Sequence, residues 1–356
     1  MVGKRFEPRG PQMPRSKVPA LLLWSVLGLL VLSYVSEGNA TPPPSEASVV
    51  PYVDLHVDLP YQHNYKGMAF LRGTGQFPAE KAAKGGLYAV VLPLFVPASV
   101  SPEGPRISDY EESWRSIEDA LKSQAIYAPV GAVPSSGQIR TFYSFEGMGP
   151  FSQEPEKLAE WVRRGVRLFG LVHNQHNALA SSAMDRRVVD YGLTERGRTV
   201  VSSIYALGGV VDISHASDRA AADIIAMALE LGRPVVATHS NARHLMNHPR
   251  NLSDELLDGV ARTGGVVGIN FHSAFLVGAR RATLSDVVRQ IVYVTKRIGE
   301  EHVAIGSDFE GGIRTPRGLS DLGDVQHLVA ALTATGMAEA SVRAILGGNA
   351  MRILAP

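Results

Sequence analysis

Histidine and acidic residues recur in this chain at the ends of short apolar segments of the kind that form β-strands. Imidazole nitrogens and carboxylate oxygens bind zinc-like ions and exchange protons near neutral pH. The residues found in this position are His56, Asp58, Glu146, His173, His215, His239 and Asp308. Their repeated placement predicts an enzyme with a metal centre at one end of a sheet.

The first pair, His56 and Asp58, lies two residues apart on an expected strand, so both side chains point to the same face. Asp54 shares that face and is expected either to support the pair or to be a buried structural acid. Taken alone, the pair also fits a core histidine bonded to a neighbouring acid. A metal-binding role therefore depends on the other strand ends.

Glu146, His215 and His239 are the remaining candidate ligands, although each alone also fits a structural role. A carboxylate beside an apolar strand needs a cation or an ion pair when buried, and its two oxygens can bridge two ions. The two histidines end consecutive strands, which lie about 5 Å apart. With His56 and Asp58, they predict two Zn²⁺ per chain, bridged by Glu146 and by a hydroxide that serves as the nucleophile. Manganese and cobalt accept the same ligands.

Three further residues are expected to act on a bound substrate. Asp308 is suited to take a proton from the nucleophile and pass it to a leaving amine. His173 is suited to polarise a carbonyl or stabilise its oxyanion. Arg250 lies in a long loop after the sixth expected strand, where a guanidinium could hold a substrate carboxylate bidentately. Arg243 is an alternative for this role, and a solvated loop arginine fits the sequence equally well.

The composition limits the chemistry. Hydrophobic residues make up 45% of the chain and charged residues 19%, which suits a large core. The formal net charge is +1, so no nucleic-acid partner is predicted. There is no cysteine, which excludes disulfides, a cysteine nucleophile and thiolate ligands. Any metal must therefore be held by imidazole and carboxylate groups.

The N-terminus has the features of a targeting segment. Basic residues precede an apolar run over 18–35, which is followed by small residues and a proline-rich stretch. We predict a cleaved export signal over 1–40, a linker over 41–48 and a single domain over 49–356. The apolar run is also long enough to be considered as a retained membrane anchor. An exported, periplasmic location is expected, with membrane association only through this segment.

Strand and helix patterns alternate through the rest of the chain, which indicates βαβ units and a parallel sheet. Strands are expected at 49–57, 87–96, 139–145, 166–172, 209–214, 234–238, 265–271 and 303–307. Amphipathic helices are expected at 113–124, 154–164, 194–207, 217–231, 253–263, 283–298 and 338–346. An open doubly wound sheet gathers its site at one switch point, whereas functional residues here end most of the strands. A (β/α)8 TIM-type barrel, with its site at the C-terminal ends of the strands, is therefore favoured.

The same residues carry a resemblance to a known family. Between residues 53 and 354, the chain resembles the membrane (renal) dipeptidases, the M19 metallopeptidases of the amidohydrolase-like group. The matching motifs include Val53-Asp-Leu-His56-Val-Asp58-Leu-Pro60, Glu146-Gly147, Val172-His173-Asn174, Asp212-Ile-Ser-His215, His239-Ser240, Arg250-Asn251, Gly306-Ser-Asp308 and Gly347-Gly-Asn349. The stretch 177–182 and His272 depart from the family pattern.

The resemblance implies a binuclear zinc site in a (β/α)8 barrel. It divides the ligands between two ions that share Glu146, with His56 and Asp58 on one ion and His215 and His239 on the other. It further implies that His173 contacts the scissile group and that Arg250 binds the C-terminal carboxylate of a dipeptide. Asp308 would shuttle the proton.

These observations predict a zinc-dependent dipeptidase acting on small peptides, including those with a D-configured C-terminal residue. One alternative is a binuclear hydrolase of the same fold that acts on lactones, N-acyl amino acids or phosphoesters. The other is an inactive exported binding protein, against which the intact set of five ligands argues. The sequence does not decide between a monomer and a homodimer.

Overall fold

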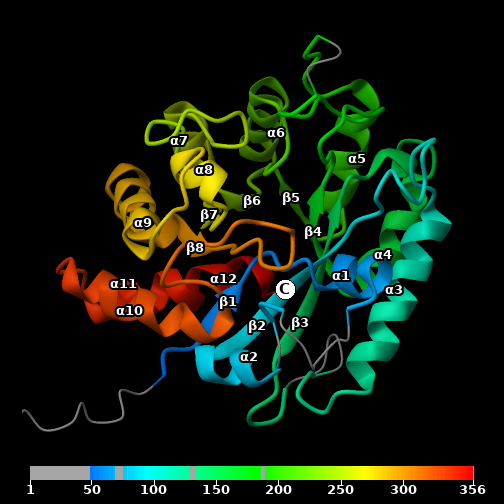
Figure 1. Cartoon of the computed structure of the whole chain (residues 1–356). Coiled ribbons are helices and arrows are strands. Elements are labelled where there is room, and N and C mark those ends of the chain that lie inside the picture. Colours follow the sequence, from blue (N-terminus) through cyan, green and yellow to red (C-terminus); the bar gives the residue numbers. More distant parts are fainter. Residues whose placement is uncertain (1–48, 69–74, 78, 129–133, 186–188, 356) are drawn as a thin grey trace, which may run out of the picture. The chain divides into compact units, whose positions relative to one another are not determined.

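Eight parallel strands form one sheet in the computed structural model, which describes residues 49–68, 75–77, 79–128, 134–185 and 189–355 (Figure 1). The strands are β1 (Tyr52–Asp54), β2 (Leu87–Leu94), β3 (Arg140–Glu146), β4 (Val166–Gly170), β5 (Val210–Asp212), β6 (Val235–Ser240), β7 (Val266–Ile269) and β8 (Val303–Ile305). Each strand pairs with the next in chain order. The Leu55 amide donates to the Ile305 carbonyl at 2.9 Å, which joins the last strand to the first. The predicted (β/α)8 barrel is confirmed.

Helices connect the strands and surround them (Figure 1). They are α1 (Leu59–Lys66), α2 (Ala79–Gly85), α3 (Ile107–Lys122), α4 (Leu158–Arg163), α5 (Glu195–Ala206), α6 (Asp218–Leu231), α7 (Asp254–Arg262), α8 (Ser273–Val277), α9 (Leu284–Ile298), α10 (Val325–Ala334), α11 (Glu339–Arg343) and α12 (Asn349–Leu354). Four of them, α5, α6, α7 and α9, agree with the predicted helices to within one residue at each end. Each follows a hydroxyl residue that caps its first turn, namely Thr194, Ser217, Ser253 and Thr283.

Three predicted helices differ from the observed ones. The predicted helix over 154–164 is observed as a 3-10 turn over Pro155–Lys157 followed by α4. Helix α3 begins at Ile107, six residues before the predicted start, because Asp109 accepts a hydrogen bond from the Arg106 amide at 2.8 Å and caps the helix there. The predicted helix over 338–346 is observed as α11, which runs through a π-helical turn over Ala344–Gly348 into α12. Helices α1, α2, α8 and α10 were not predicted from the sequence.

The barrel interior is apolar at one end and polar at the other. A cluster of buried side chains contains residues of every strand and three residues of α12: Val53, Ala89, Phe142, Leu168, Val210, Val236, Val266, Ala304, Ala350, Ile353 and Leu354. Helix α12 lies at the N-terminal ends of the strands, where Asn349 Nδ2 donates to the carbonyls of Glu300 and Val303 at 2.7 Å each. The alternation along β3 that points Phe142 inward also points Glu146 inward, at the opposite end.

The predicted signal or anchor over 1–40 and the linker over 41–48 lie outside the described residues. The described residues belong to one compact unit, Val49–Pro356. No helix within the described ranges combines the length and apolar character needed to cross a membrane.

Replacing Asn349 with alanine should destabilise the barrel. The variant leaves the buried Val303 carbonyl and the partly buried Glu300 carbonyl without their side-chain donor, so we expect the free energy of unfolding to fall by about 1–3 kcal/mol. Arg343→Ala is the control, because it removes only an exposed pair with Glu339, worth less than about 1 kcal/mol. Chemical denaturation followed by circular dichroism measures both. Equal losses in the two variants would contradict the structural role of Asn349.

Candidate metal centre

The five predicted ligands meet around one carboxylate at the C-terminal ends of the strands. Glu146 ends β3, and its Oε1 atom lies 2.8 Å from His215 Nε2 and 3.7 Å from His239 Nε2. The same oxygen lies 3.8 Å from His56 Nε2, which in turn lies 3.6 Å from Asp58 Oδ2. All five side chains are buried. Side chains that are far apart in sequence are therefore close enough together to bind the same metal ion.

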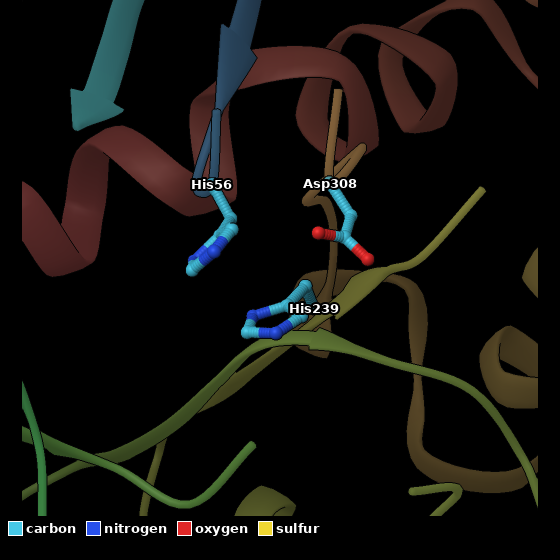
Figure 2. Close-up of side chains that lie close together, drawn as sticks. All are labelled: His56, His239 and Asp308. Atoms are coloured by element: carbon cyan, nitrogen blue, oxygen red, sulfur yellow. The ribbon is translucent and has the colours of Figure 1, made fainter. Parts of the chain in front are cut away.

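The donor atoms form three overlapping groups, within each of which all atoms lie within 4.8 Å of one another. The groups are His56–Asp58–Glu146, Glu146–His173–His215 and His56–His239–Asp308. Figure 2 shows the third group, in which the side chains of His56, His239 and Asp308 approach one another from three different strand ends. His215 and His239 are also neighbours, with their Nε2 atoms 3.0 Å apart. The arrangement thus offers more than one cation position, with His173 and Asp308 beside the predicted ligands.

The centre is rich in carboxyl groups. Asp58, Glu146 and Asp308 contribute three carboxyl groups, whereas Arg250 is the buried guanidinium that faces them. Burial opposes the charged form of His56, but the charges of Asp58, Glu146 and Asp308 outweigh it and raise the pKa of His56 to about 10. A positive charge is therefore stabilised at this position. Buried carboxylates of this kind need cations.

The other histidines of the centre have the protonation state that a metal ligand requires. Burial lowers the pKa of His215 and of His239 well below the usual value, and nearby Arg250 adds to the effect. Burial also lowers the pKa of His173. Burial alone would raise the pKa of Glu146, but His173 and His215 outweigh it and hold that pKa well below its usual range. Neutral imidazoles and an ionised carboxylate are the forms that bind metal ions.

The donor set therefore fits divalent cations. It consists of imidazole nitrogens and carboxylate oxygens without a thiolate, since the chain has no cysteine. The ligands are buried and end different strands, so the barrel fixes their separations. Zinc, manganese and cobalt all accept such ligands.

Asp308 follows β8 in a strained turn beside the ligands. Its φ angle is +64° and that of Glu310 is +68°, a region that side chains other than glycine rarely adopt. Asn270, just after β7, donates from Nδ2 to Asp308 Oδ2 at 3.0 Å. Desolvation and the nearby Asp58 carboxylate raise the pKa of Asp308 well above its usual value. This carboxyl group is therefore suited to holding a proton near neutral pH.

Of the two arginines that fitted a carboxylate clamp, Arg250 lies in the centre and Arg243 does not. Arg250 is 3% exposed, and its Nη2 atom donates to His239 Nε2 at 2.8 Å. Its Nη1 atom is buried without a hydrogen-bond partner among the described residues. Burial lowers the pKa of Arg250 to about 10, so it remains a cation at neutral pH. Arg243 is instead paired with Asp218 near the surface.

His173 stands between the ligands and an open cleft. Its Nε2 atom lies 3.9 Å from Glu146 Oε2, and its ring packs against Phe95 at a centroid distance of 4.4 Å. The cleft has a volume of about 660 Å³ and is bounded by the loops that follow β2 and β4. Its walls include Val96, Pro105, Tyr110, Asn174 and Asn177. Its size is within the range of small-molecule sites, about 300–1,000 Å³.

Asp54 is a structural acid, one of the two roles that the sequence left open. It is fully buried and accepts hydrogen bonds from the amides of Ser307 at 2.9 Å and His56 at 3.1 Å. It thereby fixes the end of β1 against the end of β8. Sequence reasoning gave no role to Asn270 or to Phe275, whose ring lies 5.6 Å from the Arg250 guanidinium. Asn270 is a polar residue at the end of a strand, β7, so the criterion that identified the other candidates would have found it. Phe275 lies on a helix that was not predicted.

Comparisons with known proteins show the family of the chain. A family model described as membrane dipeptidase (peptidase family M19) matches residues 47–356. An uncharacterized dipeptidase of Schizosaccharomyces pombe is 27% identical over 380 residues, which covers 97% of this chain and 92% of the relative. A dipeptidase of Aspergillus terreus is 29% identical over 348 residues, which covers 86% of this chain and 84% of the relative.

Solved structures show the same fold. A metallo peptidase from Rhodobacter sphaeroides has a TM-score of 0.74 and 23% identity over 86% of this chain and 99% of that chain. A probable dipeptidase from Pseudomonas aeruginosa has a TM-score of 0.76 and 22% identity over 86% of this chain and 94% of that chain.

The barrel and its cluster of histidines and carboxylates define a metallohydrolase of the (β/α)8 class. Within that class, the chain belongs to the membrane dipeptidase family, peptidase family M19. It is a peptide-bond hydrolase, as the resemblance of its motifs implied.

Replacing Gly311 with alanine should disturb the centre without unfolding the barrel. A Cβ atom there would lie 2.5 Å from Asp308 Oδ1 and 2.5 Å from Asp58 Oδ2, so both carboxyl groups must move. We expect kcat/KM for dipeptides to fall about 10- to 100-fold, because small displacements of catalytic groups have effects of this size. Steady-state hydrolysis and the thermal midpoint are measured together.

The neighbouring Gly312→Ala is the matched control. Its φ angle is +73° and its Cβ would meet nothing within 4 Å, so alanine strains the backbone without touching either carboxyl group. We expect a stability loss of about 1 kcal/mol and near-normal activity. Equal activity losses in the two variants would show that the turn itself, rather than the carboxyl positions, limits activity.

Proposed function

We propose that the protein is a zinc-dependent dipeptidase with two ions per chain that share Glu146. One ion would be held by His56 and Asp58, and the other by His215 and His239. The observation that supports this most directly is the position of Glu146, whose Oε1 atom lies within 3.8 Å of the Nε2 atoms of three different histidines. When bound, the ions would polarise the peptide carbonyl and lower the pKa of water.

Arg250 is proposed to bind the C-terminal carboxylate of the substrate. Its guanidinium is buried and its Nη1 atom has no partner among the described residues, so it offers a donor that a carboxylate would satisfy. Burial also makes this pairing strong, because water does not screen it. A substrate held at Arg250 lies beside His239, which contacts that guanidinium.

Asp308 and His173 are proposed to act on the scissile bond. Asp308, whose raised pKa favours the protonated form, would hand its proton to the departing amine nitrogen. His173 lines the cleft, where a neutral imidazole can donate a hydrogen bond to the developing oxyanion. Asn270 would keep the Asp308 carboxyl group in place through its bond to Oδ2.

The cleft beside His173 supports a substrate with side chains of more than one size. Its volume of about 660 Å³ leaves room around a small dipeptide. We propose that dipeptides with a D-configured C-terminal residue are included. The similar metallo peptidase from Rhodobacter sphaeroides was solved with a phosphinate mimic of the dipeptide L-Ala-D-Ala.

Lactones and uncharged esters are less consistent with this site, because they lack the carboxylate that would satisfy buried Arg250. An inactive binding protein is disfavoured by the complete set of ligands and by membership of a peptidase family. We also propose that the segment over 1–40 is an export signal and that the protein acts on small peptides in the periplasm.

The metal proposal predicts about two zinc ions per folded chain. Elemental analysis of purified protein should find this ratio, and dialysis against a chelator should abolish dipeptide hydrolysis until zinc is restored. His215→Ala should lower the ratio toward one ion, since one of the proposed sites loses a ligand. A fully active protein that contains no metal would refute the proposal.

Arg250→Ala should weaken dipeptide hydrolysis selectively. Loss of a charge-assisted bond is worth about 1.5–3 kcal/mol, so kcat/KM for a dipeptide should fall about 10- to 100-fold. Hydrolysis of the same dipeptide with an amidated C-terminus should change little. Arg243→Ala is the matched control, because that arginine is paired with Asp218 outside the centre. An equal effect of Arg250→Ala on both substrates would rule out the carboxylate clamp.

A further inference from the structure

A buried polar cluster lies behind His239 and joins the ends of β5 and β6. At its centre is Asp212, the last residue of β5, which accepts four hydrogen bonds. Ser214 donates its amide at 2.9 Å and its hydroxyl at 2.7 Å, both to Oδ1. Thr238 donates its amide to Oδ1 at 3.0 Å and its hydroxyl to Oδ2 at 2.6 Å. The residues that immediately follow these two donors are His215 and His239.

The donors and acceptors in this cluster determine where a proton lies on His239. A carboxylate only accepts, so the single hydroxyl proton of Thr238 points to Asp212. The Thr238 oxygen also lies 2.8 Å from His239 Nδ1. Because the Thr238 hydroxyl already donates its hydrogen bond to Asp212, its oxygen can only accept a hydrogen bond from His239. The Nδ1 atom of His239 must therefore carry a hydrogen.

A second contact, on the other side of the ring, leads to the same assignment. Arg250 Nη2 lies 2.8 Å from His239 Nε2. A guanidinium has only donors, so Nε2 must be the acceptor. Two independent partners, one at each ring nitrogen, thus place the hydrogen on Nδ1 and the lone pair on Nε2. That lone pair is on the side of the ring that lies 3.0 Å from His215 Nε2.

The two other proposed histidine ligands lack such a partner. The Nδ1 atoms of His56 and His215 are buried without a hydrogen-bond partner in the part of the chain that the structure describes. His215 Nε2 instead lies 2.8 Å from an oxygen of Glu146, an acceptor, so in this arrangement that nitrogen carries the hydrogen. Of the three, His239 is the histidine whose Nδ1 and Nε2 atoms both have partners, and these partners place its lone pair on Nε2.

We propose that Thr238 is a positioning residue that relays the charge of Asp212 to His239 and fixes its imidazole in the Nδ1–H form for metal binding. The proposal rests on the metal centre proposed above. It adds that one ligand, His239, is held with a fixed ring orientation and a fixed hydrogen position. A hydrogen bond to the remote nitrogen of a ligating histidine fixes the ring and increases its basicity, and its loss weakens metal binding about 10- to 100-fold.

The test compares Thr238→Val, which keeps the shape of the side chain but removes the hydroxyl, with Thr238→Ser, which keeps the hydroxyl. Zinc affinity is measured by competition with a chromogenic chelator, and zinc release by the rate of transfer to that chelator. We expect Thr238→Val to bind one of the two ions about 10- to 100-fold more weakly and to release it faster. Thr238→Ser should remain within about threefold of the unmodified protein, since it retains the hydroxyl contact.

Ser214→Ala is the matched control for damage to the cluster. It also removes a hydroxyl that donates to Asp212, but that hydroxyl contacts the backbone amide of His239, at 3.1 Å, and not its ring. We expect a lower thermal midpoint with zinc release close to normal. Equal acceleration of zinc release in Ser214→Ala and Thr238→Val would overturn the proposal, because a general loosening of the cluster would then explain both.

A direct measurement uses the metal-free full chain. The ¹⁵N shifts of its histidine side chains, with His239 assigned by its loss in His239→Gln, report which ring nitrogen carries the hydrogen. A hydrogen on Nδ1 supports the proposal and a hydrogen on Nε2 overturns it, even if Thr238→Val does not fold. Failure of the unmodified protein to bind zinc would refute the metal centre, whereas the position of this hydrogen would still decide the role of Thr238.

Discussion

The structure depends on placing several carboxyl groups together inside the mouth of a barrel. Asp58 and Glu146 are buried, Asp308 lies beside them, and Arg250 is a buried arginine that faces them. Such a cluster is costly to bury unless cations compensate it. The pKa of His56 is raised for the same reason, because the neighbouring carboxyl groups stabilise positive charge at that imidazole. The need for cations therefore links the fold to the chemistry.

The barrel interior has an apolar end, which stabilises the fold, and a polar end, which holds the carboxyl groups. Helix α12 and the apolar cluster fill the end at which the strands begin, which supplies the burial that stabilises the fold. Polar ligands occupy the end at which the strands finish. There the strand ends are cross-linked by buried acids: Asp54 fixes β1 against β8, and Asp212 fixes β5 against β6. These acids do not face the metal centre, but they hold the residues that do.

The sequence predicts the barrel well and names candidate ligands that the structure brings together, because both follow from local patterns. Apolar runs mark the strands, and a polar residue at the end of a run, such as Glu146 or His239, must lie at the rim of a parallel barrel. Residue patterns alone could not separate Arg250, which the family resemblance implied, from Arg243, because that choice depends on the pairing of Arg243 with Asp218, which is distant in sequence. The early start of α3 was missed for a different reason, since Arg106 is not a usual N-cap residue and the cap is made by the side chain of Asp109.

The turn after β8 positions the proposed proton-transfer group, Asp308, by other means than the proposed metal ligands. Asp308 and Glu310 both adopt positive φ angles, which persist only when the surroundings hold them. Glu310 is held by the amides of Gln76 and Phe77, at 2.5 and 2.9 Å, and thus ties the turn to a distant segment. Glycine at 311 then leaves space for the carboxyl group of Asp308 beside Asp58. The proposed ligands at the ends of β3 and β6 are positioned by regular strands, whereas Asp308 is positioned by a strained turn. A carboxyl group placed in this way can keep a high pKa a few ångströms from groups that must remain ionised.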